Sequence, residues 1–120
     1  MPKILDQKKL RAAGAYTTSL SGDTDQNFGF RGIVVTTNIT NAGSGSLTVN
    51  IYQVDANGID RLILSATYTS TGLKVLRVMP TLTAVANVDA QDEIPNNFRV
   101  DLIHNNANSM TYSSAYSMVV

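Results

Sequence analysis

The chain has 120 residues with nine basic and nine acidic side chains, one histidine, no cysteine and no tryptophan. This length corresponds to one domain, and the missing cysteines exclude a disulfide framework and any site that needs a thiolate. No apolar run reaches the ~18 residues that cross a bilayer, and no apolar h-region follows the first residues, so we expect a soluble protein, made in a cytoplasm, that binds no membrane.

The zero formal net charge hides an uneven distribution along the chain. The first 11 residues carry Lys3, Lys8, Lys9 and Arg11 against a single acidic side chain, and the remainder is mildly acidic. This asymmetry predicts an extended basic arm over residues 1–14 and a globular domain over residues 15–120. The arm would lie on an acidic neighbour, which could be another copy of the chain, although a frayed terminus is the alternative. We expect no nucleic acid partner, because the domain has no basic patch with interleaved aromatic side chains.

Local signals in the first part of the chain are mixed. Residues 5–13 have partial helical spacing and predict two helical turns that end at Gly14. Residues 15–20 have β-strand composition. The polar run over residues 21–27 predicts a loop.

From residue 30 onward, short β-type segments alternate with turns. The clearest strand is 30–40, whose alternating inner positions are Ile33, Val35, Thr37 and Ile39. Further strands are predicted at 47–54, 61–69, 73–79, 98–104 and 109–120. Leu73, Val75 and Met79 are expected to form the apolar side of their strand.

Turn residues separate these segments at regular intervals. The Asn57-Gly58 pair suits the positive backbone angles of a hairpin turn, and the irregular run 81–94 predicts a loop. Seven or eight strands at spacings near ~10 residues are typical of a β-sandwich or barrel. We therefore expect an all-β fold, an antiparallel β-sandwich of immunoglobulin-like or jelly-roll-like type, with an N-terminal arm and no second domain.

Few side chains offer catalytic chemistry. Asp101 lies three residues before the only histidine, His104, and so faces the other side of the same strand, which does not fit a Ser-His-Asp site. No G-x-S-x-G nucleophile elbow is present. We expect no catalytic residue and no enzyme activity.

Oxygen-bearing side chains cluster at two turns, in residues 21–25 and 55–60. Calcium favours such loops, but neither matches the helix-flanked calcium loop with its closing Glu. Asp89, Asp92 and Glu93 share one loop, which favours a solvated loop over a carboxylate pair for glycoside hydrolysis. We expect no metal and no cofactor.

The last strand places Tyr112 and Tyr116 on one face. That face is predicted to be core or interface, and the low charge of the strand predicts that a neighbouring strand or subunit covers its edge. Exposed tyrosines on a polar sheet would alternatively bind a sugar.

Five segments, in order, resemble a family of small all-β proteins of tailed bacteriophages. They are GIVVTTNIT (32–40), SLTVNIYQVD (46–55), TGLKVLRVMP (71–80), IPNNFRV (94–100) and SMTYS (109–113). The likeness covers most of residues 30–118. It departs from the family at Thr81, where a Gly is expected, and at Phe98, where a Trp is common.

This resemblance implies a virion protein that binds the major capsid protein as a head decoration, cement or minor capsid protein. We expect it to act as a homo-oligomer through an interface of Lys3, Lys8, Lys9, Arg11, Tyr112 and Tyr116. Two alternatives stay open. One is a structural protein of the tail or neck, and the other is a carbohydrate-binding module for a host glycan.

Overall fold

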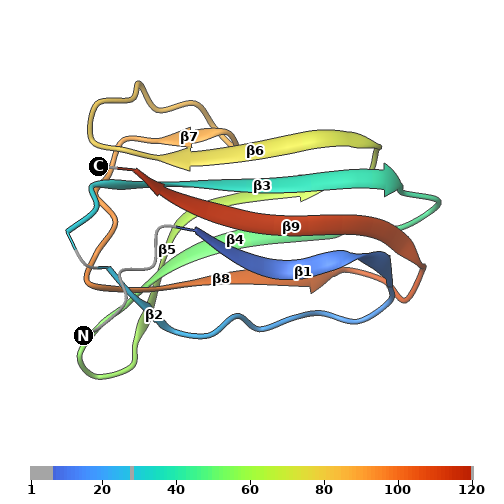
Figure 1. Ribbon diagram of the computed structural model, residues 1–120, viewed down its shortest axis with the longest axis horizontal. Coiled ribbons are helices and arrows are strands. Elements are labelled where there is room, and N and C mark those ends of the chain that lie inside the picture. Colours follow the sequence, from blue (N-terminus) through green and yellow to red (C-terminus); the bar gives the residue numbers. More distant parts are fainter. Residues whose placement is uncertain (1–6, 28, 120) are drawn as a thin grey trace.

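The computed structural model describes residues 7–27 and 29–119, and these residues form nine β-strands and no helix (Figure 1). It contains, within those ranges, no helix long and apolar enough to cross a membrane. The strands are β1 (Gln7–Tyr16), β2 (Asp25–Gln26), β3 (Gly32–Asn41), β4 (Leu47–Val54), β5 (Asp60–Tyr68), β6 (Gly72–Val78), β7 (Asp89–Ala90), β8 (Asn97–His104) and β9 (Met110–Val119).

The strands form two sheets that pack face to face. One sheet has five strands in the order β1-β9-β3-β6-β7, and the other has four in the order β2-β8-β4-β5. Every neighbouring pair is antiparallel except β6 and β7. Figure 1 shows β3, β6 and β9 in front of β4 and β8. The expected all-β sandwich is confirmed.

The core lies between the sheets and follows the alternation of the sequence. The inner positions of β3, namely Ile33, Val35, Thr37 and Ile39, are each no more than 1% exposed. Alternate residues of a strand point to opposite faces, so one face of each strand reaches the core. The same alternation buries residues of β4, β8 and β9, including Leu47, Val49, Ile51, Phe98, Val100, Leu102, Tyr112 and Tyr116.

The hairpin between β4 and β5 differs in detail from the expected Asn-Gly turn. Gly58 has a φ of 77°, whereas Asn57 has no positive φ. The carboxylate of Asp55 accepts hydrogen bonds from the backbone N–H groups of Asn57 (2.8 Å) and Ile59 (2.9 Å). This is a three-residue loop in which only the last position needs glycine, and not a two-residue turn with two positive angles.

The helical turns expected over residues 5–13 are wrong for residues 7–13, which belong to β1. The arm expected over residues 1–14 likewise differs from the structure, because its part from Gln7 onward pairs with β9, from Gln7 opposite Ser117 to Tyr16 opposite Met110. Weak local helical spacing is outweighed by the backbone hydrogen bonds that β9 offers along its side. As expected, a neighbouring strand therefore covers β9.

The apolar side expected for β6 is also wrong. Leu73 is 66% exposed, whereas Leu76 and Val78 are 1% and 0% exposed. Leu76 lies opposite Val35, and Val78 lies opposite Ile33. Residues opposite each other in a sheet share a face, so the register with β3, which the local pattern does not show, selects the buried set.

Candidate functional site

Lys8, one of the expected interface residues, connects the edge strands of the two sheets, because it lies in β1 and contacts Asp25 in β2. Its Nζ lies 2.9 and 3.0 Å from the two carboxylate oxygens of Asp25 and 3.2 Å from Asp23. Asp25 also accepts a hydrogen bond from the hydroxyl of Tyr116, at 2.7 Å. Burial alone would lower the pKa of Lys8, but the hydrogen bonds and charges of Asp25 and Asp23 outweigh it and raise that pKa. Because β1 and β2 belong to different sheets, this cluster ties the sheets together.

Arg11 makes a second contact of this kind. Its Nη1 donates to the hydroxyl of Tyr112 and to the carbonyl of Thr18, each at 2.7 Å. Its guanidinium also lies 4.4 Å from the ring centroid of Tyr16. The phenol of Tyr112 is in turn 2.8 Å from Nε2 of His104. These contacts link Arg11 of β1 to the hydroxyl of Tyr112 in β9, and through it to the imidazole of His104 in β8.

His104 is part of this packing, through its contact with the Tyr112 hydroxyl. Burial lowers its pKa, and the charge of Arg11 lowers it further. Its Nδ1 is buried without a hydrogen-bond partner among the described residues. A proton added to this ring would lie near the positive charge of Arg11, and no carboxylate in the described part of the chain forms an ion pair with His104.

We expect the free energy of unfolding to fall as pH is lowered from 7 to about 5. The unfolded histidine has a pKa near 6.5 and the folded one has a lower pKa, so in this window the unfolded chain binds more protons and acid favours it. Urea unfolding at several pH values measures the slope. His104→Gln should flatten that slope, and an unchanged slope in this variant would contradict the assignment.

The residues expected at an interface therefore differ in burial and in the contacts that they make. Tyr112 and Tyr116 are each 1% exposed and belong to the core, so the sandwich hides them from any surface partner, including a glycan. Lys8 and Arg11 serve internal contacts. Lys3 lies outside the described residues. Lys9 alone among them is exposed and makes no ion pair within residues 7–27 and 29–119.

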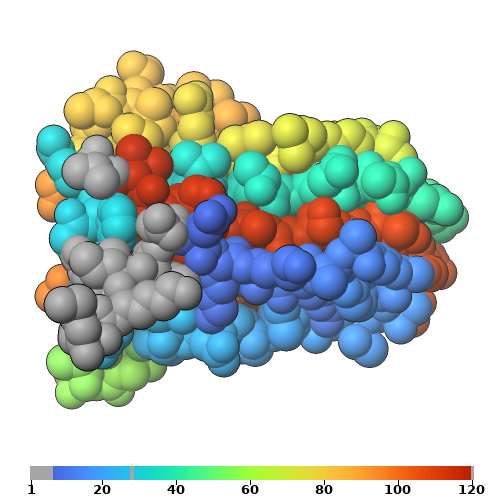
Figure 2. Space-filling view, viewed as in Figure 1, coloured from blue at the N-terminus to red at the C-terminus, as the bar shows by residue number. Residues whose placement is uncertain are grey.

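Lys9 lies beside a flat surface on the outer side of the five-stranded sheet. Figure 2 shows β1, β9, β3 and β6 side by side on this surface. We call its central part the neutral face, and it consists of Ala13, Thr36, Asn38, Ser113 and Ala115. None of these side chains is charged, and all are small or of medium size.

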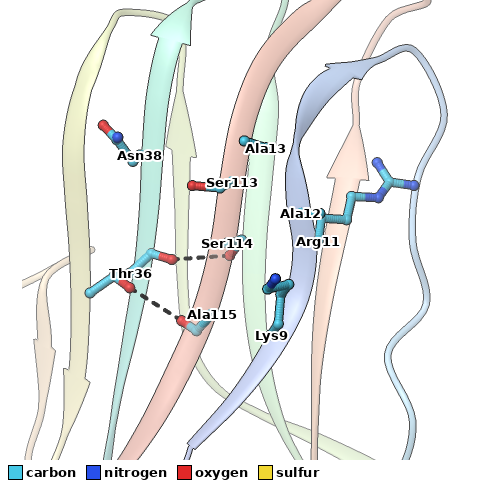
Figure 3. Close-up of a pocket in the computed structure, with 9 residues that line it drawn as sticks. All are labelled: Lys9, Arg11, Ala12, Ala13, Thr36, Asn38, Ser113, Ser114 and Ala115. Atoms are coloured by element: carbon cyan, nitrogen blue, oxygen red, sulfur yellow. Dashed lines mark hydrogen bonds between the residues drawn. The ribbon is translucent and has the colours of Figure 1, made fainter.

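The neutral face contains a shallow depression of about 290 Å³ (Figure 3). Two register shifts in β1, on either side of Arg11, interrupt its pairing with β9 beside the depression. In Figure 3, Lys9 points to the side of β1 that faces β9, whereas the guanidinium of Arg11 points away from the depression. Ser114 Oγ donates to the carbonyl of Thr36 at 3.1 Å, and Thr36 Oγ1 donates to the carbonyl of Ala115 at 3.4 Å, so these hydroxyls hold β3 and β9 together.

The outer side of the four-stranded sheet has a different character. Arg99 forms two hydrogen bonds to Asp60 (3.1 and 2.7 Å) and one to Asp101 (2.9 Å). Its guanidinium also lies 4.9 Å from the ring centroid of Tyr52. One positive charge thus faces two negative ones, and Asp101 also accepts a hydrogen bond from the backbone N–H of Gly22 at 2.9 Å. This cluster holds residues of the N-terminal segment on β8.

The loop carboxylates considered for calcium or sugar chemistry also have structural roles. Asp89 pairs with Arg77 at 2.8 Å, and Asp92 pairs with Arg61 at 3.2 Å. Asp55 and Glu93 border a polar cleft of about 570 Å³ at one end of the sandwich, but the Asp55 carboxylate already caps its own turn. Over the described ranges, no three metal-binding side chains come together.

No family model matches the chain, and no curated protein matches it. The solved structures to which it is similar include the SPBc2 prophage-derived protein YomS, with a TM-score of 0.49 and 16% identity over 98% of this chain and 99% of that one. Infectious bursal disease virus, Gx strain, gives a TM-score of 0.43 and 11% identity over 94% of this chain and 31% of that one. The Gt strain of that virus gives 0.40 and 17% over 94% and 32%. These scores and identities are low, so the function is inferred from the chain's own residues.

Proposed function

We propose that this protein is a non-enzymatic structural protein of a tailed-bacteriophage particle, and that it binds the major capsid protein as a head decoration protein. The neutral face supports this proposal most directly, because it offers an uncharged surface with a shallow depression, which Lys9 and Arg11 border. The ordered sequence resemblance supports it as well. The segments that carry the resemblance cover β4 and β6, nearly all of β3 and the first halves of β8 and β9, which are strands of both sheets.

The chemistry of the neutral face suits passive docking. Small side chains lose little rotamer freedom on burial, and Ser, Thr and Asn bind partner groups directly or through water. Lys9 would meet an acidic side chain of the shell. A rim pair of this kind is worth about 0.2–1 kcal/mol and selects the partner more than it tightens binding. Binding that is specific for the assembled shell stabilises that shell by mass action.

The composition of purified particles tests the proposal. Particles of the phage or prophage that encodes this chain are analysed by quantitative mass spectrometry and electron cryomicroscopy. We expect a copy number in fixed ratio to the major capsid protein, with density on the outside of the head. Absence from the particles would reject a virion role, and density in the tail or neck alone would reject the head assignment.

Lys9→Glu tests the role of the face on particles that lack the protein and are supplied with it in solution. We expect the affinity per site to fall about 3- to 10-fold, because the change removes a favourable rim contact and places a carboxylate against an acidic partner. Arg31→Glu is the matched control, since Arg31 is exposed and is not among the residues of the neutral face. Equal losses in both variants would show that net charge matters and this face does not.

A further inference from the structure

The two sheets differ in how well their edges are protected. A sheet edge presents unpaired backbone N–H and C=O groups, and proteins blunt it with short strands, bulges or charges. The edge strands β2 and β7 have two residues each, and β1 has two register shifts. The fourth edge strand, β5, has nine residues with a single register shift near its start, and among the described residues it pairs along one side only, with β4.

The composition of β5 leaves its edge open to pairing. Its two charged residues stand at the start, where Asp60 pairs with Arg99 and Arg61 pairs with Asp92. The following seven residues, LILSATY, carry no charge. Leu62 is 52% exposed, because a register shift in the β4–β5 pairing lies between the partners of Leu64 and Leu62. A long, uncharged, partly apolar edge of this kind is suited to a further strand.

We propose that β5 pairs antiparallel with β5 of a second copy of this chain, centred on Ser65, so that the two four-stranded sheets become one continuous sheet. Antiparallel pairing of a strand with its own copy is isologous, since both copies use the same surface. In this register the uncharged residues 62–68 of each copy lie opposite one another.

Charge also favours a second copy as the occupant. With Ser65 at the centre, Arg61 lies opposite Thr69 and Asp60 opposite Ser70, so no charged residue of β5 faces a like charge. Residues 62–68 offer no charged side chain with which a charged strand of another protein could form an ion pair. This proposal does not depend on the capsid role, because it concerns the purified chain in solution.

Sedimentation velocity of the full chain over a range of concentrations tests the pairing. We expect a reversible dimer. Leu62→Lys should raise its dissociation constant at least about tenfold, because it places two solvated charges, one from each copy, on the paired edges. Leu73→Lys is the matched control, since Leu73 is 66% exposed but lies on β6 in the other sheet. Circular dichroism checks that both variants are folded.

Cysteine cross-linking tests the register, and the absence of native cysteine makes the result specific. Ser65→Cys should form a disulfide-linked dimer on mild oxidation, since the two cysteines would face each other across the symmetry axis. Ser113→Cys, on the neutral face, should remain uncross-linked. A chain that is monomeric at all concentrations, equal weakening by the two lysine variants, or equal cross-linking of the two cysteine variants would each overturn the proposal.

Discussion

Asp25→Asn is expected to lower the free energy of unfolding by about 2–3 kcal/mol. The side chain of Asp25 is 14% exposed and accepts hydrogen bonds from both Lys8 and Tyr116. Asparagine retains the shape but loses the charge, so the ammonium group of Lys8, whose side chain is 25% exposed, loses its closest anion. Chemical denaturation followed by circular dichroism measures the change.

Asp23→Asn is the matched control for this prediction, because Asp23 contacts the same lysine at 3.2 Å with a side chain that is 84% exposed. Water screens an exposed pair, so we expect a change below about 0.5 kcal/mol. The two variants remove the same charge from the same partner and differ in burial and in the hydrogen bond that Tyr116 donates to Asp25. Equal effects would contradict the claim that Asp25 connects the edge strands of the two sheets.

Gly22→Ala is expected to destabilise the fold by about 2 kcal/mol. A Cβ at this position would lie 2.1 Å from the carbonyl oxygen of Val100, which is a backbone atom of β8 and cannot turn aside. The backbone around residue 22 would have to move away from β8. It would then lose the hydrogen bond from Gly22 N–H to Asp101, and denaturation followed by circular dichroism measures the cost.

Gly14→Ala provides the comparison within the same N-terminal segment. A Cβ there would meet the ring of Tyr16 at 3.4 Å, which is an ordinary contact. We expect a change within about 0.5 kcal/mol, since alanine also reduces the conformational freedom of the unfolded chain. If Gly22→Ala were as mild as Gly14→Ala, the close approach of residue 22 to β8 would not hold in solution.

Both sets of variants examine how the N-terminal segment, residues 7–27, closes the sandwich. It pairs with β9 through β1 and with β8 through β2, and Leu20 bridges to Leu102 between these two strands. Two of the four basic residues expected in an arm, Lys8 and Arg11, hold this segment in place. Deleting it would therefore remove a strand from each sheet, which is why a single substitution at Lys9 is the sharper probe of binding.

The candidate site was only partly predictable. Lys9 was among the residues expected at an interface, but Lys8 and Arg11 carry the same charge in the same short run and point into internal contacts. The register shifts around Arg11 decide which of the three faces outward. The neutral face was not predicted, because its residues come from strands far apart in the sequence. The only signal was the share of Ser and Thr at the outer positions of β3 and β9.

The sequence by itself determined the β-sandwich class, most strand positions and the inner faces of β3, β4 and β8. Those features depend on alternation between neighbouring residues and on turn residues, which are local properties. Only the tertiary structure decided that residues 7–16 form a strand, that Leu76 and Val78 are the buried side of β6, and that Tyr112 and Tyr116 lie in the core. Each of these depends on which strand lies alongside and in what register, and backbone hydrogen bonds between distant segments set that choice.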